Sequence, residues 1–339
     1  MAIPLYKCST PLIHMNGNFG LFYDKFCNKW LEDWKGLGEN GKREWIEAAV
    51  RKGEIGDSDL IKEITERRRA FISETGGMAL LFRTKSAFVT GLGRSHPVEN
   101  GFAWHHILGA PYLPGSSIKG MVRSWATNWI NADPKEVGRI FGPYDSTSVG
   151  SVVFLDAIPN RAVRLKMEIM APHYSSYYKE SSKDPEPPAD WHSPVPIPFL
   201  AVDREQEFLF GLIPRRGGAQ DCEKVNVWLK GAMHDIGAGA KTAVGYGRFV
   251  YLEPSSPGRD WLESLAKVEG TTVENLAKTS PKLLVEKWDM VENQDLKSSV
   301  HHEIRSIYEK IGYWDNPLGK SAKAAIKRYK SWQEVGDSQ

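Results

Sequence analysis

Hydrophobic residues recur at helical spacing near both ends of the chain. Positions 57–75 carry apolar residues at mostly helical spacing, followed by two glycines: Leu60, Ile61, Ile64, Phe71 and Ile72. Because apolar residues three or four apart share one face of a helix, this pattern predicts a helix that the glycines end. Similar patterns predict helices over 259–267, 281–289, 296–311 and 319–333. We therefore expect residues 1–77 to be a mainly helical N-terminal extension and residues 258–339 a helical C-terminal region.

The middle of the chain mixes strand and helix patterns. Segments with strand-like composition or alternation lie at 78–91, 151–158, 162–170, 198–203, 207–214 and after Gly247. Helices are predicted from Ser116 or Ser117 to Trp129 and over 221–234. The order is strand, helix, strand, strand, insertion, strand, helix, strand. This order predicts an α+β fold with a ferredoxin-like (RRM-like, split βαβ) core and insertions over 78–257. Residues 173–198 carry six prolines and are predicted to form a projecting loop.

Composition narrows the class of protein. The chain has 339 residues, 41% of them hydrophobic and 25% charged, which is typical of a folded protein. The start of the chain lacks the pattern of a signal peptide, and no apolar run is long enough for a membrane span. Three distant cysteines argue against a disulfide framework, so a reducing cytoplasm is expected. The net charge of +2 does not itself indicate a nucleic-acid binder, so local clusters of cations matter more.

The strongest candidate for such a cluster is a glycine-rich segment before the last predicted strand. It contains Gly237, Gly239, Lys241, Gly245, Tyr246, Gly247 and Arg248. Glycines let a backbone approach a partner closely, exposed N–H groups can bind anions, and a tyrosine can stack on a base. The glycines precede a strand and not a helix, so the segment is not a dinucleotide fingerprint. A tight turn that packs against the sheet is the alternative interpretation.

Further cations accompany glycines and serines elsewhere. The predicted helix start PGSSIKGMVR (114–123) could offer a phosphate its free N–H groups through Ser116 and Ser117, with Lys119 and Arg123 on one helix face. Its alternative is a capped amphipathic helix with two solvated cations. Three arginines in loops complete the candidate RNA-binding set: Arg94, Arg215 and Arg216.

Other chemistry-bearing residues have plainer interpretations. His96, His105 and His106 have no usual zinc spacing, and hydrogen bonding is favoured over catalysis. Asp145 and Asp156 are expected to be structural. The aromatic residues of the projecting loop suit either base stacking or a neighbouring subunit: His173, Tyr174, Tyr177, Tyr178, Trp191 and His192. A late helix carries lysines on one face, which are either solvated or in contact with RNA: Lys320, Lys323, Lys327 and Lys330.

Several segments together resemble the RAMP superfamily of CRISPR-associated proteins, and within it subunit six of the type III-B Cmr effector complex. They are TGLGRSHPVENGF (90–102), PYLPGSSIKGMVRSW (111–125), GSVVFLDA (150–157), KMEIMAPHY (166–174), PFLAVD (198–203) and GAGAKTAVGYGRF (237–249). The resemblance covers residues 78–252, about half the chain. It implies a ferredoxin-like RNA-binding core whose glycine-rich loop contacts guide RNA, near the guide's 3′ end and beside the backbone subunits. Related backbone subunits cut RNA with an aspartate after the first strand, whereas the corresponding loop here has Glu99 and no aspartate.

Three functions remain open from the sequence. The first is a non-catalytic guide-RNA-binding subunit for antiviral defence, with guide RNA, target RNA and other Cmr subunits as partners and without a cofactor or metal. The second is an endoribonuclease that uses His105 or His106 with Lys119 as an oxyanion stabiliser. The third is a mainly structural assembly subunit.

Overall fold

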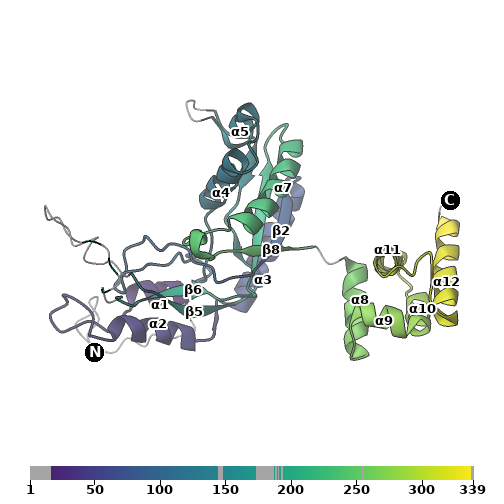
Figure 1. Cartoon of the computed structure of the whole chain (residues 1–339), viewed down its shortest axis with the longest axis horizontal. Coiled ribbons are helices and arrows are strands. Elements are labelled where there is room, and N and C mark those ends of the chain that lie inside the picture. The colour runs from purple at the N-terminus through teal and green to yellow at the C-terminus, as the bar shows by residue number, and fades with distance from the viewer. Residues whose placement is uncertain are drawn as a thin grey trace. The chain divides into compact units, whose positions relative to one another are not determined.

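The computed structural model of the chain describes residues 17–143, 148–172, 187, 189, 191, 194–253 and 256–336, the side chains of 333–336 excepted. The chain divides into two compact units, one reaching Leu252 and the other beginning at Glu253 (Figure 1). Each unit has its own hydrophobic core, so each is described by itself. No described helix has the length and apolar character that crossing a membrane requires.

The first unit is built around an antiparallel sheet. Its strands are β2 (Met78–Thr84), β3 (Val152–Phe154), β4 (Ile158–Pro159), β7 (Glu207–Pro214) and β8 (Phe249–Leu252). The order across the sheet is β3-β7-β2-β8, with β4 also paired to β7, and every pair is antiparallel. The predicted α+β class is therefore confirmed.

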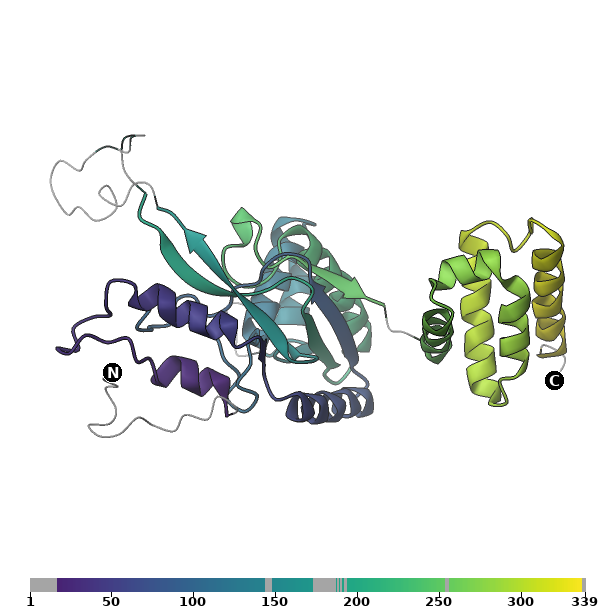
Figure 2. The ribbon, with the colours of Figure 1, turned by 90° about the horizontal axis from the view of Figure 1, so that it is seen from below.

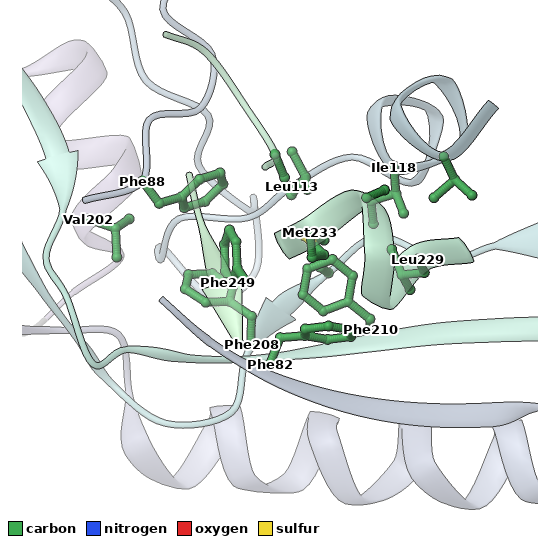
Figure 3. Close-up of a cluster of buried hydrophobic side chains, with 14 of the residues drawn as sticks. Phe82, Phe88, Leu113, Ile118, Val202, Phe208, Phe210, Leu229, Met233 and Phe249 are labelled. Carbon is green, nitrogen blue, oxygen red and sulfur yellow. The ribbon is translucent and has the colours of Figure 1, made fainter. Parts of the chain in front are cut away.

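Helices pack on both faces of this sheet. On one face lie α4 (Gly115–Asn128), α5 (Pro134–Phe141) and α7 (Ala219–Asp235), over aromatic side chains of the strands such as Phe82, Phe210 and Phe249 (Figure 3). Successive strand residues point to opposite faces, so Ala79 and Leu209 face the other way and pack with α3 (Ser58–Glu74). Figure 2 shows α3 running alongside the strands.

A second, three-stranded antiparallel sheet completes the first unit. It consists of β1 (Glu54–Ile55), β5 (Val163–Met170) and β6 (Ile197–Val202), in the order β1-β5-β6. Helices α1 (Phe19–Lys25) and α2 (Gly41–Arg51) bring Phe19, Tyr23 and Trp45 into the main core of the unit. The N-terminal helices thus belong to the same packed unit as the large sheet. Backbone pairing between Phe88 and Val202 joins the two sheets.

The second unit is helical. Its elements are α8 (Pro257–Val268), α9 (Val273–Thr279), α10 (Pro281–Asp289), α11 (Gln294–Lys310) and α12 (Lys320–Gly336). They enclose a core of their own, which contains the buried side chains of Trp288, Tyr308 and Tyr329. His301 is also buried there, with its Nε2 atom 3.1 Å from the Tyr329 carbonyl oxygen.

Some sequence expectations differ from the structure. The strand predicted over 78–91 ends at Thr84, because the chain then leaves the large sheet to bridge β6. Helix α4 begins at Gly115 and not at a serine, with Pro114 in the N-cap position. Strand β6 begins at Ile197, inside the predicted projecting loop 173–198. Most of that loop lies outside the described residues, including His173, Tyr174, Tyr177, Tyr178 and His192, as does Asp145.

Candidate nucleic-acid interface

Neither face of the large sheet is open for base stacking over its central strands. Proteins of the RRM type stack bases on aromatic residues of an exposed sheet face. Here Phe82 and Phe210 are buried under α4 and α7, and the Ile72 side chain of α3 lies against Gly211 on the opposite face. A nucleic acid would therefore have to contact this unit through loops, helix ends or sheet edges.

The glycine-rich segment forms a turn that is tied closely to the protein backbone. Gly237, Gly239 and Gly247 all have positive φ angles, and a Cβ atom at each would lie within 2.5 Å of another atom. The Gly247 N–H donates to the Ala87 carbonyl oxygen at 2.8 Å, and the Ala240 N–H donates to Val89 at 2.8 Å. These three glycines are needed for the turn's own packing.

The tip of the same turn is more open. A short 3₁₀ helix (Thr242–Val244) follows Lys241, which adopts the left-handed conformation with φ 59°. Gly245 also has a positive φ, of 94°, but a Cβ atom there would meet nothing within 4 Å. Val244 at the tip is 72% exposed. The tip therefore presents backbone and small side chains to solvent while the base of the turn is fixed.

Hairpin β5–β6 supports this tip from the side. The Lys241 Nζ atom lies 5.4 Å from the centre of the Phe199 ring, close enough for a cation–π interaction. The Tyr246 ring lies 5.8 Å from the same ring, centre to centre, and its hydroxyl donates to Glu168. Burial, and then the charge of Glu168, raise the pKa of Tyr246 above its usual value. Tyr246 is thus held by the hairpin and half-buried.

A groove of about 490 Å³ runs beside this turn. Three segments that are distant in the sequence line it: the loop 90–94, the start of α4 and the turn from Ile236 to Thr242. They bring together four of the predicted binding residues: Arg94, Ser117, Gly237 and Gly239. Arg94 is the charged residue of this lining, and its side chain is exposed. The groove combines a cation, hydroxyl groups and closely approaching backbone, which suits a sugar–phosphate chain.

The other predicted binding residues lie elsewhere. Lys119 and Arg123 are on another side of α4, because two residues turn a helix by roughly 200° and Ser117 is the one that faces the groove. Arg215 and Arg216 precede the N-terminus of α7, whereas the glycine turn follows its C-terminus. That helix has 17 residues and is therefore about 25 Å long. Exposed Ser116 is not part of the groove lining.

Two features expected to meet phosphate are engaged within the protein. The Arg248 guanidinium donates to the Ile236 carbonyl oxygen, which fixes the base of the turn. The N-terminus of α4 is occupied in part by Asp156, whose Oδ1 atom accepts from the Gly115 N–H at 2.7 Å. A carboxylate at a helix N-terminus stabilises the helix and reduces the attraction for a further anion. The structural role expected of Asp156 is confirmed.

The histidines considered for catalysis mostly hold loops in place. His96 stacks on Tyr23 at 4.7 Å between ring centres, and its Nδ1 atom accepts from the Val98 N–H. His105 accepts from the Leu108 N–H at 3.3 Å through Nδ1. Burial, and then nearby Arg68, lower the pKa of His105. His106 is exposed.

Sequence reasoning missed several residues of the groove. Thr242, Ser124 and Met121 line it, as do Leu92 and Ala240. Met121 and Ser124 could have been predicted, because they follow Ser117 by four and seven positions and therefore lie on the same helix face. The proximity of Thr242 depends on the fold of the turn, and no sequence pattern indicates it.

Comparison with known proteins identifies the family. The sequence matches the RAMP superfamily over residues 81–250, half of the chain. It is 32% identical to the CRISPR system Cmr subunit Cmr6 of Pyrococcus furiosus, over 50% of this chain and 66% of that protein. It is 27% identical to the corresponding subunit of Saccharolobus solfataricus, over 55% of this chain and 56% of that protein. The matched part thus spans just under two thirds of the first relative and little more than half of the second.

Solved structures give a weaker likeness. A chain of the type III-B Cmr-beta complex bound to cognate target RNA aligns with a TM-score of 0.49 and 23% identity, over 62% of this chain and 71% of its own length. The crystal structure of Cmr6 from Pyrococcus furiosus aligns with a TM-score of 0.34 and 28% identity, over 52% of this chain and 98% of its own length. The family assignment therefore depends on the sequence match over residues 81–250, and by that match the chain belongs to the RAMP superfamily.

Proposed function

We propose that this chain is a non-catalytic RNA-binding subunit of a type III-B CRISPR (Cmr) effector complex, and that it binds the guide RNA backbone in the groove beside the glycine turn. Two relatives with the name of Cmr subunit six support the assignment to such a complex. The observation that carries RNA binding is the convergence of Arg94, Ser117 and the glycine turn on one groove. Guide and target RNA and the backbone subunits would be its partners in antiviral defence.

The core that presents this groove is proposed to be ferredoxin-like. In the split βαβ pattern the four strands come in the chain order strand, helix, strand, strand, helix, strand. Strands β2, β3, β7 and β8 with helices α4 and α7 have that chain order, and their order across the antiparallel sheet is β3-β7-β2-β8. The groove would then lie where the loop after the first strand meets the turn before the last. Residues 1–77 and 258–339 would be additions to this core.

The surroundings of His105 and the lining of the groove favour an RNA-binding role over endoribonuclease activity that would use His105 with Lys119. A general base needs an accepting nitrogen that can reach the substrate. The Nδ1 atom of His105 already accepts from a backbone N–H, and its ring lies edge-on to Tyr112. The groove of the glycine turn has no histidine in its lining. Exposed His106 is the residue through which the enzymatic alternative would have to act.

The test is a salt titration of RNA binding by the full chain. Arg94→Gln with Lys241→Gln removes the groove's cation and the one at the tip of the turn. Each lost phosphate contact lowers the slope of log affinity against log salt by about 0.7 for single strands. We expect a slope lower by about 1.4, and an affinity about 25-fold weaker near 0.1 M salt. Fluorescence anisotropy of a labelled single-stranded RNA measures both.

A matched pair of exposed lysines provides the control. Lys62→Gln with Lys135→Gln removes the same charge from α3 and α5, away from the groove lining. This control is expected to keep the parent slope. Equal slopes for the groove pair and the control pair would place the RNA elsewhere and overturn the proposal for the groove.

A further inference from the structure

Helix α12 of the second unit carries its cations differently from the other charged helices. In α2, α3, α8, α10 and α11, an arginine or lysine forms an ion pair with a glutamate four positions away. Such pairs stabilise a helix, whereas like charges at the same spacing destabilise it. Residues 320–332 contain five cations and no acidic residue. The stretch 320–332 of helix α12 is therefore strongly positive, and a bound polyanion would neutralise part of this charge.

Four of these cations form a stripe, which we call the lysine stripe: Lys320, Lys323, Lys327 and Lys330. Their spacing of three and four residues places them on one face of the helix, over about 15 Å. All four side chains are exposed, while Ala322, Ala325 and Tyr329 on the opposite face are buried. Lys330 lies 3.6 Å from Asp315; within the described residues, Lys320, Lys323 and Lys327 have no ion pair.

An apolar hollow borders the stripe. It has a volume of about 450 Å³ and lies between α10 and α12, with Val285, Ala324 and Ala325 in its lining. Lys320 and Lys282 also line it, as does Glu286, which lies 3.8 Å from Lys282 on the same helix α10. A surface that combines a row of cations with an apolar recess matches an unpaired nucleotide, which has a charged backbone and an apolar base face.

We propose that the lysine stripe and this hollow form a second RNA site, for single-stranded RNA and without sequence preference. The sugar–phosphate chain follows the stripe and a base rests against the hollow. Single strands are favoured over duplexes because a paired base cannot enter the hollow. The site belongs to the second unit alone and does not depend on the groove of the glycine turn.

The test uses the full chain with Arg94→Gln and Lys241→Gln already in place, so that binding through the groove is reduced. The variant Lys320→Gln/Lys323→Gln/Lys327→Gln is compared with Lys267→Gln/Lys278→Gln/Lys310→Gln, which removes three exposed lysines from other helices of the same unit. The probe is a labelled 20-nucleotide oligouridylate, followed by fluorescence anisotropy between 50 and 300 mM salt. Circular dichroism checks that both variants remain folded.

We expect the stripe variant to lower the salt slope by about 2 and the affinity near 0.1 M salt by about 100-fold, as three lost phosphate contacts require. The control variant is expected to keep the parent slope, and replacement of the three stripe lysines by arginine to keep most of the affinity. Duplex RNA of equal length is expected to compete less well than the single strand. Equal losses in the stripe and control variants would overturn the proposal, as would a stripe that binds poly-L-glutamate but not the oligouridylate.

The two RNA sites can fail separately. If the groove pair leaves binding unchanged while the stripe variant weakens it, the groove proposal fails and this inference stands. The opposite result removes the stripe and leaves the groove.

Discussion

Replacement of Gly247 by alanine tests the geometry of the glycine turn most directly. A Cβ atom at this position would lie 1.9 Å from the Ala238 carbonyl oxygen, and the residue has φ 69°. A left-handed conformation costs a residue other than glycine about 1–2 kcal/mol. Relief of the clash also disturbs two hydrogen bonds, Gly247 N–H to Ala87 and Ala238 N–H to Gly247, worth about 1 kcal/mol each. Gly247→Ala is therefore expected to lower the free energy of unfolding of the first unit by about 3–4 kcal/mol.

Gly245→Ala is the matched variant, because Gly245 also has a positive φ but has open space where its Cβ atom would lie. It is expected to cost only the conformational strain, about 1–2 kcal/mol. Denaturant unfolding followed by fluorescence gives both values, and the transition of the second unit serves as an internal reference. Equal destabilisation by the two alanines would mean that Gly247 does not pack against Ala238, and the description of the turn would be wrong.

Two further predictions concern polar contacts in the two units. Tyr246→Phe removes the hydroxyl that donates to Glu168 and is expected to lower the free energy of unfolding of the first unit by about 1 kcal/mol, measured in urea. Adding Glu168→Gln to this variant is expected to cost little more. If the losses from the two substitutions were additive, the contact between the two side chains would be contradicted. Burial lowers the pKa of His301 below its usual 6.5, so the unfolded chain takes up a proton at a higher pH than the folded unit does. The second unit is therefore expected to lose stability as pH falls below about 6.5, and His301→Gln to reduce that pH dependence, as unfolding at a series of pH values would show.

Much of the fold was predictable from periodicity. The alternation over 162–170 agrees with strand Val163–Met170, and the strand-like apolar run over 207–214 agrees with strand Glu207–Pro214. The helical pattern over 281–289 agrees with helix Pro281–Asp289. These segments are regular along their whole length and bury one face or both, so local sequence and tertiary packing favour the same conformation.

The missed elements have identifiable causes. Helix α5 begins at Pro134; a proline usually indicates the end of a helix, but in the first position of a helix its missing N–H costs nothing. Helix α9 has only seven residues, too few for a convincing apolar pattern. Helix α3 was predicted as part of an extension, but the sequence could not indicate that its buried Ile61 and Ile72 cover a sheet formed by strands far along the chain.

The same limit applies to the glycine turn, where sequence composition identifies the segment but not the task of each residue. Four glycines and two cations suggested one flexible, phosphate-binding loop. In the folded chain these residues have different roles. Gly237, Gly239 and Gly247 allow close contacts with the protein backbone, and Arg248 donates to the Ile236 carbonyl oxygen and so fixes the base of the turn. This division leaves Gly237 and Gly239 in the groove lining with little freedom to move, while the tip presents its cation, Lys241, beside the Phe199 ring. Because Phe199 belongs to hairpin β5–β6 and contacts both Lys241 and Tyr246, the position of the cation at the tip depends on this hairpin as well as on the turn itself.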